Sequence, residues 1–137
     1  MPTARDVMTR NVEVIKSDET VLDAAKRLTE LNVGSMPICD GERLRGMLTD
    51  RDIVTKVVAA GKDPSTVRAA ELETGKPVTI GADDSIEEAM RTMAEHQVRR
   101  LPVIDGHALV GIVSQADLAK VLPEKKTGSM VADISSG

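Results

Sequence analysis

The residues of this chain that could do chemistry lie in one short motif that occurs twice. Residues 46–52 read Gly-Met-Leu-Thr-Asp-Arg-Asp, and residues 111–117 read Gly-Ile-Val-Ser-Gln-Ala-Asp. Both fit Gly-x-x-[Thr/Ser]-x-x-Asp at an expected strand-to-helix junction, a pattern that suits a ribose. Glycine admits close approach to the backbone, and an ionised aspartate can accept hydrogen bonds from two neighbouring hydroxyls. The motif predicts ribose contacts by Asp52 and Asp117, with Thr49 and Ser114 assisting.

The same residues have an alternative role that needs no ligand. A Thr or Ser followed three residues later by an acid is also a capping box, which satisfies the first free amides of a helix. Thr20 with Asp23 shows this spacing elsewhere in the chain, and so does Ser85 with Glu88. Occurrence at the same place in both halves favours binding, but helix capping alone stays open.

A pair of arginines, Arg99 and Arg100, distinguishes the two halves. The first half has Gly34 and Ser35 at the corresponding positions. Two guanidinium groups beside a binding cleft suit phosphate recognition. Solvated surface charge, or pairing with a local acid such as Glu95, is the alternative. The asymmetry predicts two clefts that are not equivalent.

An internal repeat must position these motifs. With an offset of 65 residues, eleven positions match without a gap, from Ile15/Ile80 to Asp52/Asp117. Each copy is expected to read strand, helix, strand, strand, helix. In the first copy these elements are a strand over 12–15, a helix from 21 that Gly34 ends, strands over 36–39 and 44–48, and a helix over 49–61. The second copy repeats this order.

The repeat predicts a division of the chain into two units. Residues 1–61 and 71–122 are expected to form them, with a connector over 62–70 and a loose tail over 123–137. Short helical lead-ins are predicted over 3–8 and 67–72. Because a unit of about 60 residues is marginal alone, we expect the two to share a core.

Composition excludes several classes of function. A net charge of −4 argues against a broad electrostatic grip on nucleic acid. No apolar run approaches a membrane span, no secretion signal begins the chain, and Cys39 is the only cysteine, so a cytoplasmic protein is expected. The two histidines show no metal-ligand spacing, and no nucleophile has a recognisable base partner, so neither a metal site nor an enzyme is expected.

Taken together, these features resemble the cystathionine-beta-synthase (CBS) domain family. The resemblance rests on the doubled unit, the strands Met36-Pro37-Ile38 and Leu101-Pro102-Val103, the Asp-Gly turns and the two junction motifs. It covers about Thr3 to Leu122 and is strongest to small stand-alone actinobacterial CBS proteins.

The resemblance implies an α/β (α+β) fold of two β-α-β-β-α units. These would be related by pseudo-twofold symmetry, with their sheets packed together and two clefts between them. Many such pairs bind AMP, ADP, ATP, NAD or S-adenosylmethionine, and they usually form homodimers. In the family the junction Asp holds ribose, and the Thr or Ser lies near ribose or phosphate. The base would rest against Val14, Ile15, Met36 and Pro37, or against Thr79, Ile80, Leu101 and Pro102.

We therefore expect a non-enzymatic regulatory module that binds an adenosine-containing ligand, with no required cofactor, in a stress or energy response. Its output would pass through a downstream protein partner, a rearranged dimer or ligand buffering. The alternative is a ligand-free dimeric module for protein–protein interaction, in which both junctions serve only as helix caps.

Overall fold

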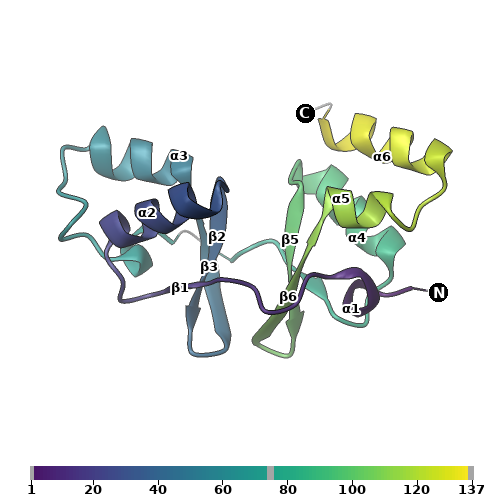
Figure 1. The fold of residues 1–137 in the computed structure, drawn as a ribbon, viewed down its shortest axis with the longest axis horizontal. Coiled ribbons are helices and arrows are strands. Elements are labelled where there is room, and N and C mark those ends of the chain that lie inside the picture. The colour runs from purple at the N-terminus through teal and green to yellow at the C-terminus, as the bar shows by residue number, and fades with distance from the viewer. Residues whose placement is uncertain (1, 74–75, 136–137) are drawn as a thin grey trace. The chain divides into compact units, whose positions relative to one another are not determined.

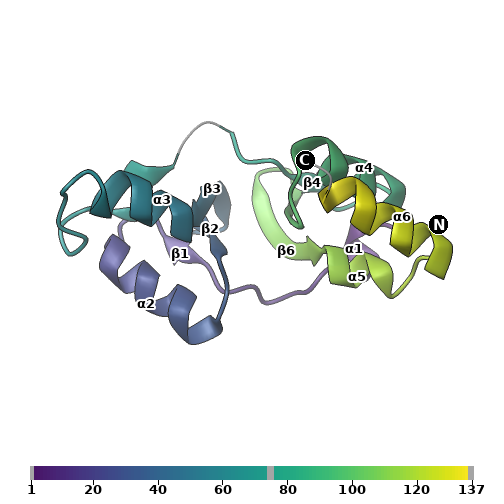
Figure 2. The same cartoon turned by 90° about the horizontal axis from the view of Figure 1, so that it is seen from above.

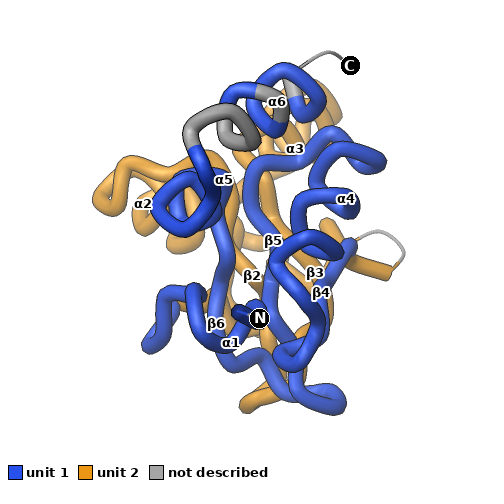
Figure 3. Tube along the Cα trace, turned by 90° about the vertical axis from the view of Figure 1, so that its right-hand side faces the viewer, with its two compact units in different colours: residues 1–12, 78–137 blue, residues 13–77 orange. Residues whose placement is uncertain are grey.

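The chain folds into two compact units that do not follow the order of the two repeats. The structure is a computed structural model that describes residues 2–73 and 76–135. Unit 2 comprises residues 13–77, and unit 1 comprises residues 1–12 together with 78–137 (Figure 3). Within the described residues each unit has a core cluster of its own, which differs from the shared core expected from the length of the halves.

Unit 2 contains the predicted order of the first repeat. Among its described residues, β1 pairs parallel with β2, and β2 pairs antiparallel with β3, so β2 lies between β1 and β3 (Figure 1). The helix that follows β3 widens into a π-helical turn, η1. The elements are β1 (Ile15–Lys16), α2 (Val21–Leu31), β2 (Ser35–Asp40), β3 (Arg43–Thr49), α3 (Asp50–Ile53), η1 (Val54–Val58) and the 3₁₀ turn η2 (Ala69–Leu72).

Unit 1 repeats this pattern in the same register. Pro37 pairs with Met47 in unit 2, and Pro102 pairs with Ile112 in unit 1, each 65 residues further along. This confirms the element order predicted from the repeat. The elements are α1 (Ala4–Val7), β4 (Ile80–Gly81), α4 (Ile86–His96), β5 (Arg100–Asp105), β6 (Ala108–Ser114), α5 (Gln115–Ala119) and α6 (Glu124–Ser135).

Both long helices begin as predicted, and α2 ends before the predicted stop. Thr20 Oγ1 accepts the Asp23 amide at 3.2 Å, and α2 then buries the stripe expected from its apolar spacing. The helix ends at Leu31, where Asn32 takes a left-handed conformation with φ of 54°. Gly34, predicted as the stop, lies beyond the end. Asparagine can close a helix here because its short polar side chain tolerates positive φ.

The two lead-ins are exchanged between the repeats. In unit 1 the Ala4 amide donates to the Asp84 carbonyl at 2.9 Å. In unit 2 the equivalent bond runs from the Ala69 amide to the Glu19 carbonyl at 2.8 Å. The lead-in of the first repeat therefore completes the second, and the reverse, so boundaries at 1–61 and 71–122 do not match the folded units.

The C-terminal segment forms a helix, where a loose tail was expected. α6 lies along α4 and α5 (Figures 1 and 2). Met130 is fully buried and Ile134 is 3% exposed, both within the core cluster of unit 1. The burial of these two large apolar side chains, four residues apart, stabilises the helix against the core of unit 1. Within the described part of the chain, no helix has the length and apolar character needed to cross a bilayer.

Candidate functional site

In unit 1 the predicted binding motif forms the junction between β6 and α5. Ser114 precedes the helix in extended conformation, and its Oγ accepts the Asp117 amide at 3.1 Å. Asp117 Oδ2 accepts the Ser114 amide at 2.9 Å in return. This reciprocal pair is a capping box. The alternative raised by the sequence is thus present, and it engages one oxygen of the carboxylate.

In unit 2 the same capping box is present, and its carboxylate is more fully engaged. Thr49 Oγ1 accepts the Asp52 amide at 3.0 Å, and Asp52 Oδ2 accepts the Thr49 amide at 3.3 Å. The second oxygen, Oδ1, forms an ion pair with Lys56 Nζ at 3.3 Å. Lys56 corresponds to Val121 in unit 1, and Asp117 makes no ion pair with any residue that the structure describes. Among the described residues, Asp117 therefore has one carboxylate oxygen without a partner, whereas both oxygens of Asp52 have one.

The arginine pair lies at the same end of the sheet as the unit 1 junction. Arg100 pairs directly with Ser114 between β5 and β6, so their side chains leave the sheet on the same face. The Arg99 carbonyl accepts the Gln115 amide, the first of α5, at 2.8 Å. Both arginines are exposed, and within residues 2–73 and 76–135 neither guanidinium has a hydrogen bond or ion pair. Two unpaired cations thus lie beside the junction.

The corresponding place in unit 2 lacks the arginine pair. The Gly34 carbonyl accepts the Asp50 amide at 2.9 Å, matching the bond between Arg99 and Gln115. Asp50 therefore occupies the position that Gln115 has in unit 1, and Gly34 occupies the position of Arg99. The predicted inequivalence of the two halves is present in the charge around their junctions.

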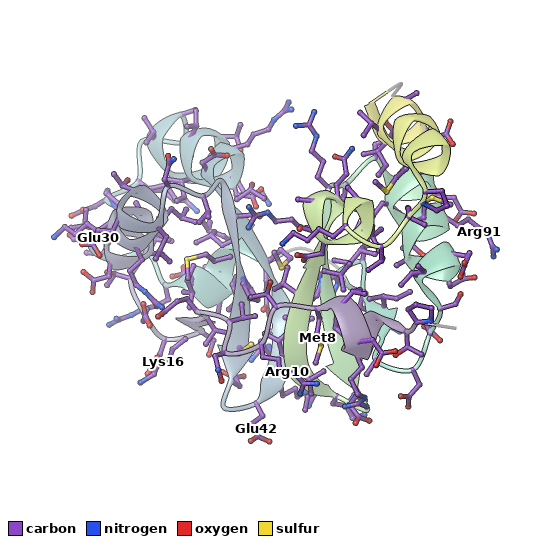
Figure 4. The ribbon with its side chains drawn as sticks, turned by 45° about the vertical axis from the view of Figure 1, so that its right-hand side comes forward. Met8, Arg10, Lys16, Glu30, Glu42 and Arg91 are labelled. Carbon is purple, nitrogen blue, oxygen red and sulfur yellow. The ribbon has the colours of Figure 1, made fainter. Side chains whose placement is uncertain are left out.

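The glycines of the motif make room for the protein itself. A Cβ on Gly111 would lie 2.5 Å from Met8 Sδ and 2.8 Å from the Thr9 carbonyl oxygen, and Figure 4 shows Met8 against β6. A Cβ on Gly46 would lie 3.2 Å from Glu73 Cβ. In each unit the exchanged lead-in crosses the strand at this glycine. The sequence indicated that another group lies close to the backbone at these glycines. In the structure that group is the protein's own lead-in segment.

Most of the residues predicted to contact a base have little free surface. Ile15 and Leu101 are fully buried, and Met36 and Ile80 are each 3% exposed. Pro37 and Pro102 are also buried, whereas Val14 and Thr79 remain partly exposed. A flat base could reach the last two without displacing core side chains. Fewer of the predicted base-contact residues are therefore accessible than the sequence suggested.

A third carboxylate in unit 2, that of Asp40 at the end of β2, is also held by neighbouring side chains. Hydrogen bonds from the Ser17 hydroxyl and the Arg45 guanidinium lower its pKa below the ordinary value. Arg45 also reaches Glu73 at 2.6 Å and so ties the lead-in to the sheet. Sequence reasoning missed this network and the Asp52–Lys56 pair, although the spacing of four residues within a predicted helix could have indicated the latter.

Comparison with known proteins gives a consistent result. A family model described as CBS domain matches residues 4–59 and 69–124. Hypoxic response protein 1 of Mycobacterium tuberculosis is 49% identical over 137 residues, covering 99% of this chain and 96% of that protein. The crystal structure of CBSX2 in complex with AMP has a TM-score of 0.76 and 26% sequence identity, covering 88% of this chain and 96% of that one.

A further solved structure, of hypoxic response protein I with two coordinated zinc ions, has a TM-score of 0.81 and 50% identity. It covers 89% of this chain and 100% of that one. Zinc prefers three or four nitrogen and sulfur ligands. In the described residues here, no three His, Cys, Asp or Glu side chains are grouped to hold a metal, and burial raises the pKa of the Cys39 thiol. The matches over both repeats establish that this chain belongs to the CBS-domain family, as a tandem pair.

Proposed function

We propose that this chain is a non-enzymatic regulatory module that binds an adenosine-containing ligand at the β6–α5 junction of unit 1. The observation that supports the proposal most directly is the free oxygen of Asp117. Its Oδ2 is occupied by the capping bond, whereas its other oxygen has no ion-pair partner among the described residues. An ionised carboxylate in this state can still accept a ribose hydroxyl.

The arginines supply the second part of the argument. Arg100 shares a face with Ser114, and Arg99 is joined to the start of α5, so a phosphate bound near the junction would meet at least one guanidinium. Unit 2 offers Asp50 and an already paired Asp52 at the equivalent place. We therefore assign the ligand to unit 1. The AMP held by the related CBSX2 supports the choice of an adenine nucleotide among AMP, ADP, ATP, NAD and S-adenosylmethionine.

The proposed cellular role rests on sequence similarity to a relative. The related hypoxic response protein 1 supports a stress response, and a single buried cysteine suits the cytoplasm. The net charge of −4 disfavours nucleic acid as the partner. We also propose the homodimer that the CBS resemblance implies.

The test is calorimetric titration of the full chain with AMP and with adenosine, comparing Asp117→Asn with Asp52→Asn. Asparagine keeps an oxygen for the Ser114 amide, so the cap survives, while its NH₂ group cannot accept a ribose hydroxyl. Loss of a hydrogen bond to a charged group predicts about 10- to 100-fold weaker AMP binding for Asp117→Asn. Asp52→Asn should leave the affinity unchanged.

The arginine assignment has its own control. Arg100→Gln should reduce the advantage of AMP over adenosine while leaving adenosine affinity unchanged, because only the phosphate contact is removed. Equal AMP affinity in wild type and Asp117→Asn would reject the assignment of Asp117 to the ribose.

Absence of binding by AMP, ADP, ATP, NAD and S-adenosylmethionine would favour the second candidate, a ligand-free interaction module. That candidate is supported by the capping boxes themselves, since both acids already serve their own backbone.

A further inference from the structure

One side chain joins helix α6 to the end of α4. Gln97, the residue that follows α4, takes a left-handed conformation with φ of 53°. Its side-chain Nε2 donates to the Ala94 carbonyl at 2.6 Å and to the Asp133 carbonyl at 3.0 Å. Both carbonyls lie in the last turn of a helix, where backbone acceptors have no partner within the helix. Because a side-chain amide carries two N–H donors, Gln97 can serve both helix ends at once.

The residues that follow Gln97 lead directly to the candidate site. Val98 packs against the core cluster of unit 1. The Arg99 carbonyl accepts the Gln115 amide, at the start of α5, at 2.8 Å. Arg100 is the next residue and begins β5. The turn over residues 97–100 therefore carries the contact with α6 at one end and both arginines at the other.

The apolar side of α6 strengthens this attachment. Met130 is fully buried and Ile134 is 3% exposed, and both belong to the core cluster that includes Leu118 of α5. Helix α6 packs on α4 and α5 together, and α5 begins at the capping box of Ser114 and Asp117 (Figure 2). The C-terminal helix thus contacts both of the helices that flank the candidate site.

Unit 2 forms the same turn beside an open groove. Asn32 has nearly the same φ as Gln97, at 54°, and the Gly34 carbonyl accepts the Asp50 amide at 2.9 Å. Asn32 lines the groove, and Gly34 and Ser35 stand where unit 1 has its arginines. The turn therefore does not need α6 in order to form. What α6 can supply is stiffness, and it does so in the unit whose turn carries the arginines.

Stiffness of this turn bears on phosphate binding. A phosphate that meets Arg99 or Arg100 has to order a long side chain with several rotatable bonds, which costs conformational entropy. Any motion of the backbone beneath that side chain adds to the cost. A turn that is already fixed at Gln97 removes this addition before the ligand arrives.

We propose that Gln97 and α6 act as a positioning element for phosphate recognition: they hold the turn over residues 97–100 and thereby place Arg99 and Arg100 for the ligand. The inference rests on the proposed function and deepens it, because it adds a distant helix to the site. Coupling between two binding events is reciprocal, so phosphate binding should in turn hold α6 on α4 and α5. Loss of the ligand would make α6 easier to release.

The first test needs no ligand and measures amide exchange of the full chain, residue by residue, by NMR. Gln97→Asn keeps a side chain that tolerates the left-handed conformation but is one methylene too short to serve both helix ends. The Gln115 amide, which donates to the Arg99 carbonyl, should then exchange about 5-fold faster, as expected for the loss of one hydrogen bond. The control is the reverse exchange in unit 2, Asn32→Gln, which should leave the Gln115 amide unchanged.

The second test is calorimetric titration with AMP and with adenosine. Gln97→Asn should weaken AMP binding about 5-fold and leave adenosine binding unchanged, because adenosine has no phosphate for the arginines to meet. Ile134→Ala, which loosens α6 without altering Gln97, should give the same pattern while circular dichroism shows a folded chain. In a chain that carries Arg99→Gln and Arg100→Gln, the Gln97→Asn change should have no further effect on AMP affinity.

The reciprocal effect is measured on wild type. Saturation with AMP should slow the exchange of the amides of residues 130–135, whereas saturation with adenosine should not. Equal exchange of these amides with AMP and with adenosine would overturn the coupling.

Two other results would overturn the inference. One is an unchanged exchange rate of the Gln115 amide in Gln97→Asn, whether or not AMP binds. The other is equal weakening of AMP and adenosine binding, because it would indicate a general loss of structure.

Failure of wild type to bind AMP would reject the proposed function. Pyrophosphate then replaces AMP as the probe, followed by the NMR signals of the Arg99 and Arg100 side chains. A response about 5-fold weaker in Gln97→Asn than in wild type would support the inference. An equal response, or none in wild type, would overturn it.

Discussion

Replacement of Gly111 by alanine is the sharpest test of how the lead-in is fitted. The new methyl group would meet Met8 Sδ at 2.5 Å and the Thr9 carbonyl oxygen at 2.8 Å. The Met8 side chain could rotate away, but the Thr9 oxygen is backbone. It also accepts the Ile112 amide at 3.0 Å, while the Thr9 amide donates to the Ile112 carbonyl at 2.8 Å. The lead-in must therefore move off the strand.

The expected cost follows from these contacts. Overpacking costs about 1–3 kcal/mol, and each of the two strained backbone hydrogen bonds adds about 1 kcal/mol, so Gly111→Ala should lower the free energy of unfolding by at least about 3 kcal/mol. For a chain of this size that corresponds to a melting temperature lower by about 10 °C. The repeat supplies a matched control, because a Cβ on Gly46 meets nothing closer than Glu73 Cβ at 3.2 Å. Gly46→Ala should change stability by less than about 1 kcal/mol.

The assay is urea unfolding followed by circular dichroism, since the chain has no tryptophan or tyrosine to fluoresce. Met8→Ala added to Gly111→Ala should restore only part of the loss, because the Thr9 oxygen still blocks the methyl group. Equal unfolding midpoints for Gly111→Ala and Gly46→Ala would refute the reasoning. Full rescue by Met8→Ala would show that the backbone contact is not the deciding one.

Three further outcomes are expected. Asp40→Asn should be less stable than wild type at neutral pH. The difference in stability should vanish as pH falls below about 4, because a carboxyl group with a lowered pKa stabilises the fold only while it is ionised. Urea unfolding midpoints across pH measure this difference, and a difference that does not change with pH would contradict the prediction. Ser114→Ala should cost about 1 kcal/mol by removing the cap of α5, measured by thermal melting, with an unchanged melt speaking against the cap. Cys39 should react with a thiol reagent only as fast as the protein opens, because it is 3% exposed and burial raises its thiol pKa; instant labelling would contradict its burial.

The sequence predicted most of the local structure because the repeat tests each assignment twice. Element order, the caps at Thr20 and Ser85 and the capping geometry at both junctions are all confirmed. These features depend on residues close together in the chain. Ribose and phosphate contacts stay predictions, although Arg99 and Arg100, which have no side-chain partner among the described residues, agree with them.

The remaining features depend on partners far apart in the sequence. The exchange of lead-ins joins Ala4 to Asp84, and no local pattern carries that information. Helix α6 looked like a loose tail because its order depends on Met130 and Ile134 meeting a groove formed by other elements. The end of α2 was misplaced because Asn32 closes it, and asparagine signals a helix stop more weakly than the nearby Gly34.

The crossing of the lead-ins bears on how such a chain could have arisen. A half-length molecule with one repeat would carry a first segment whose observed docking place lies on the body of the other repeat. Two such molecules could satisfy each other by lending their opening residues in both directions. Fusion of two such copies into one chain would keep both docking bonds, from Ala4 to Asp84 and from Ala69 to Glu19, and would add a covalent link between them.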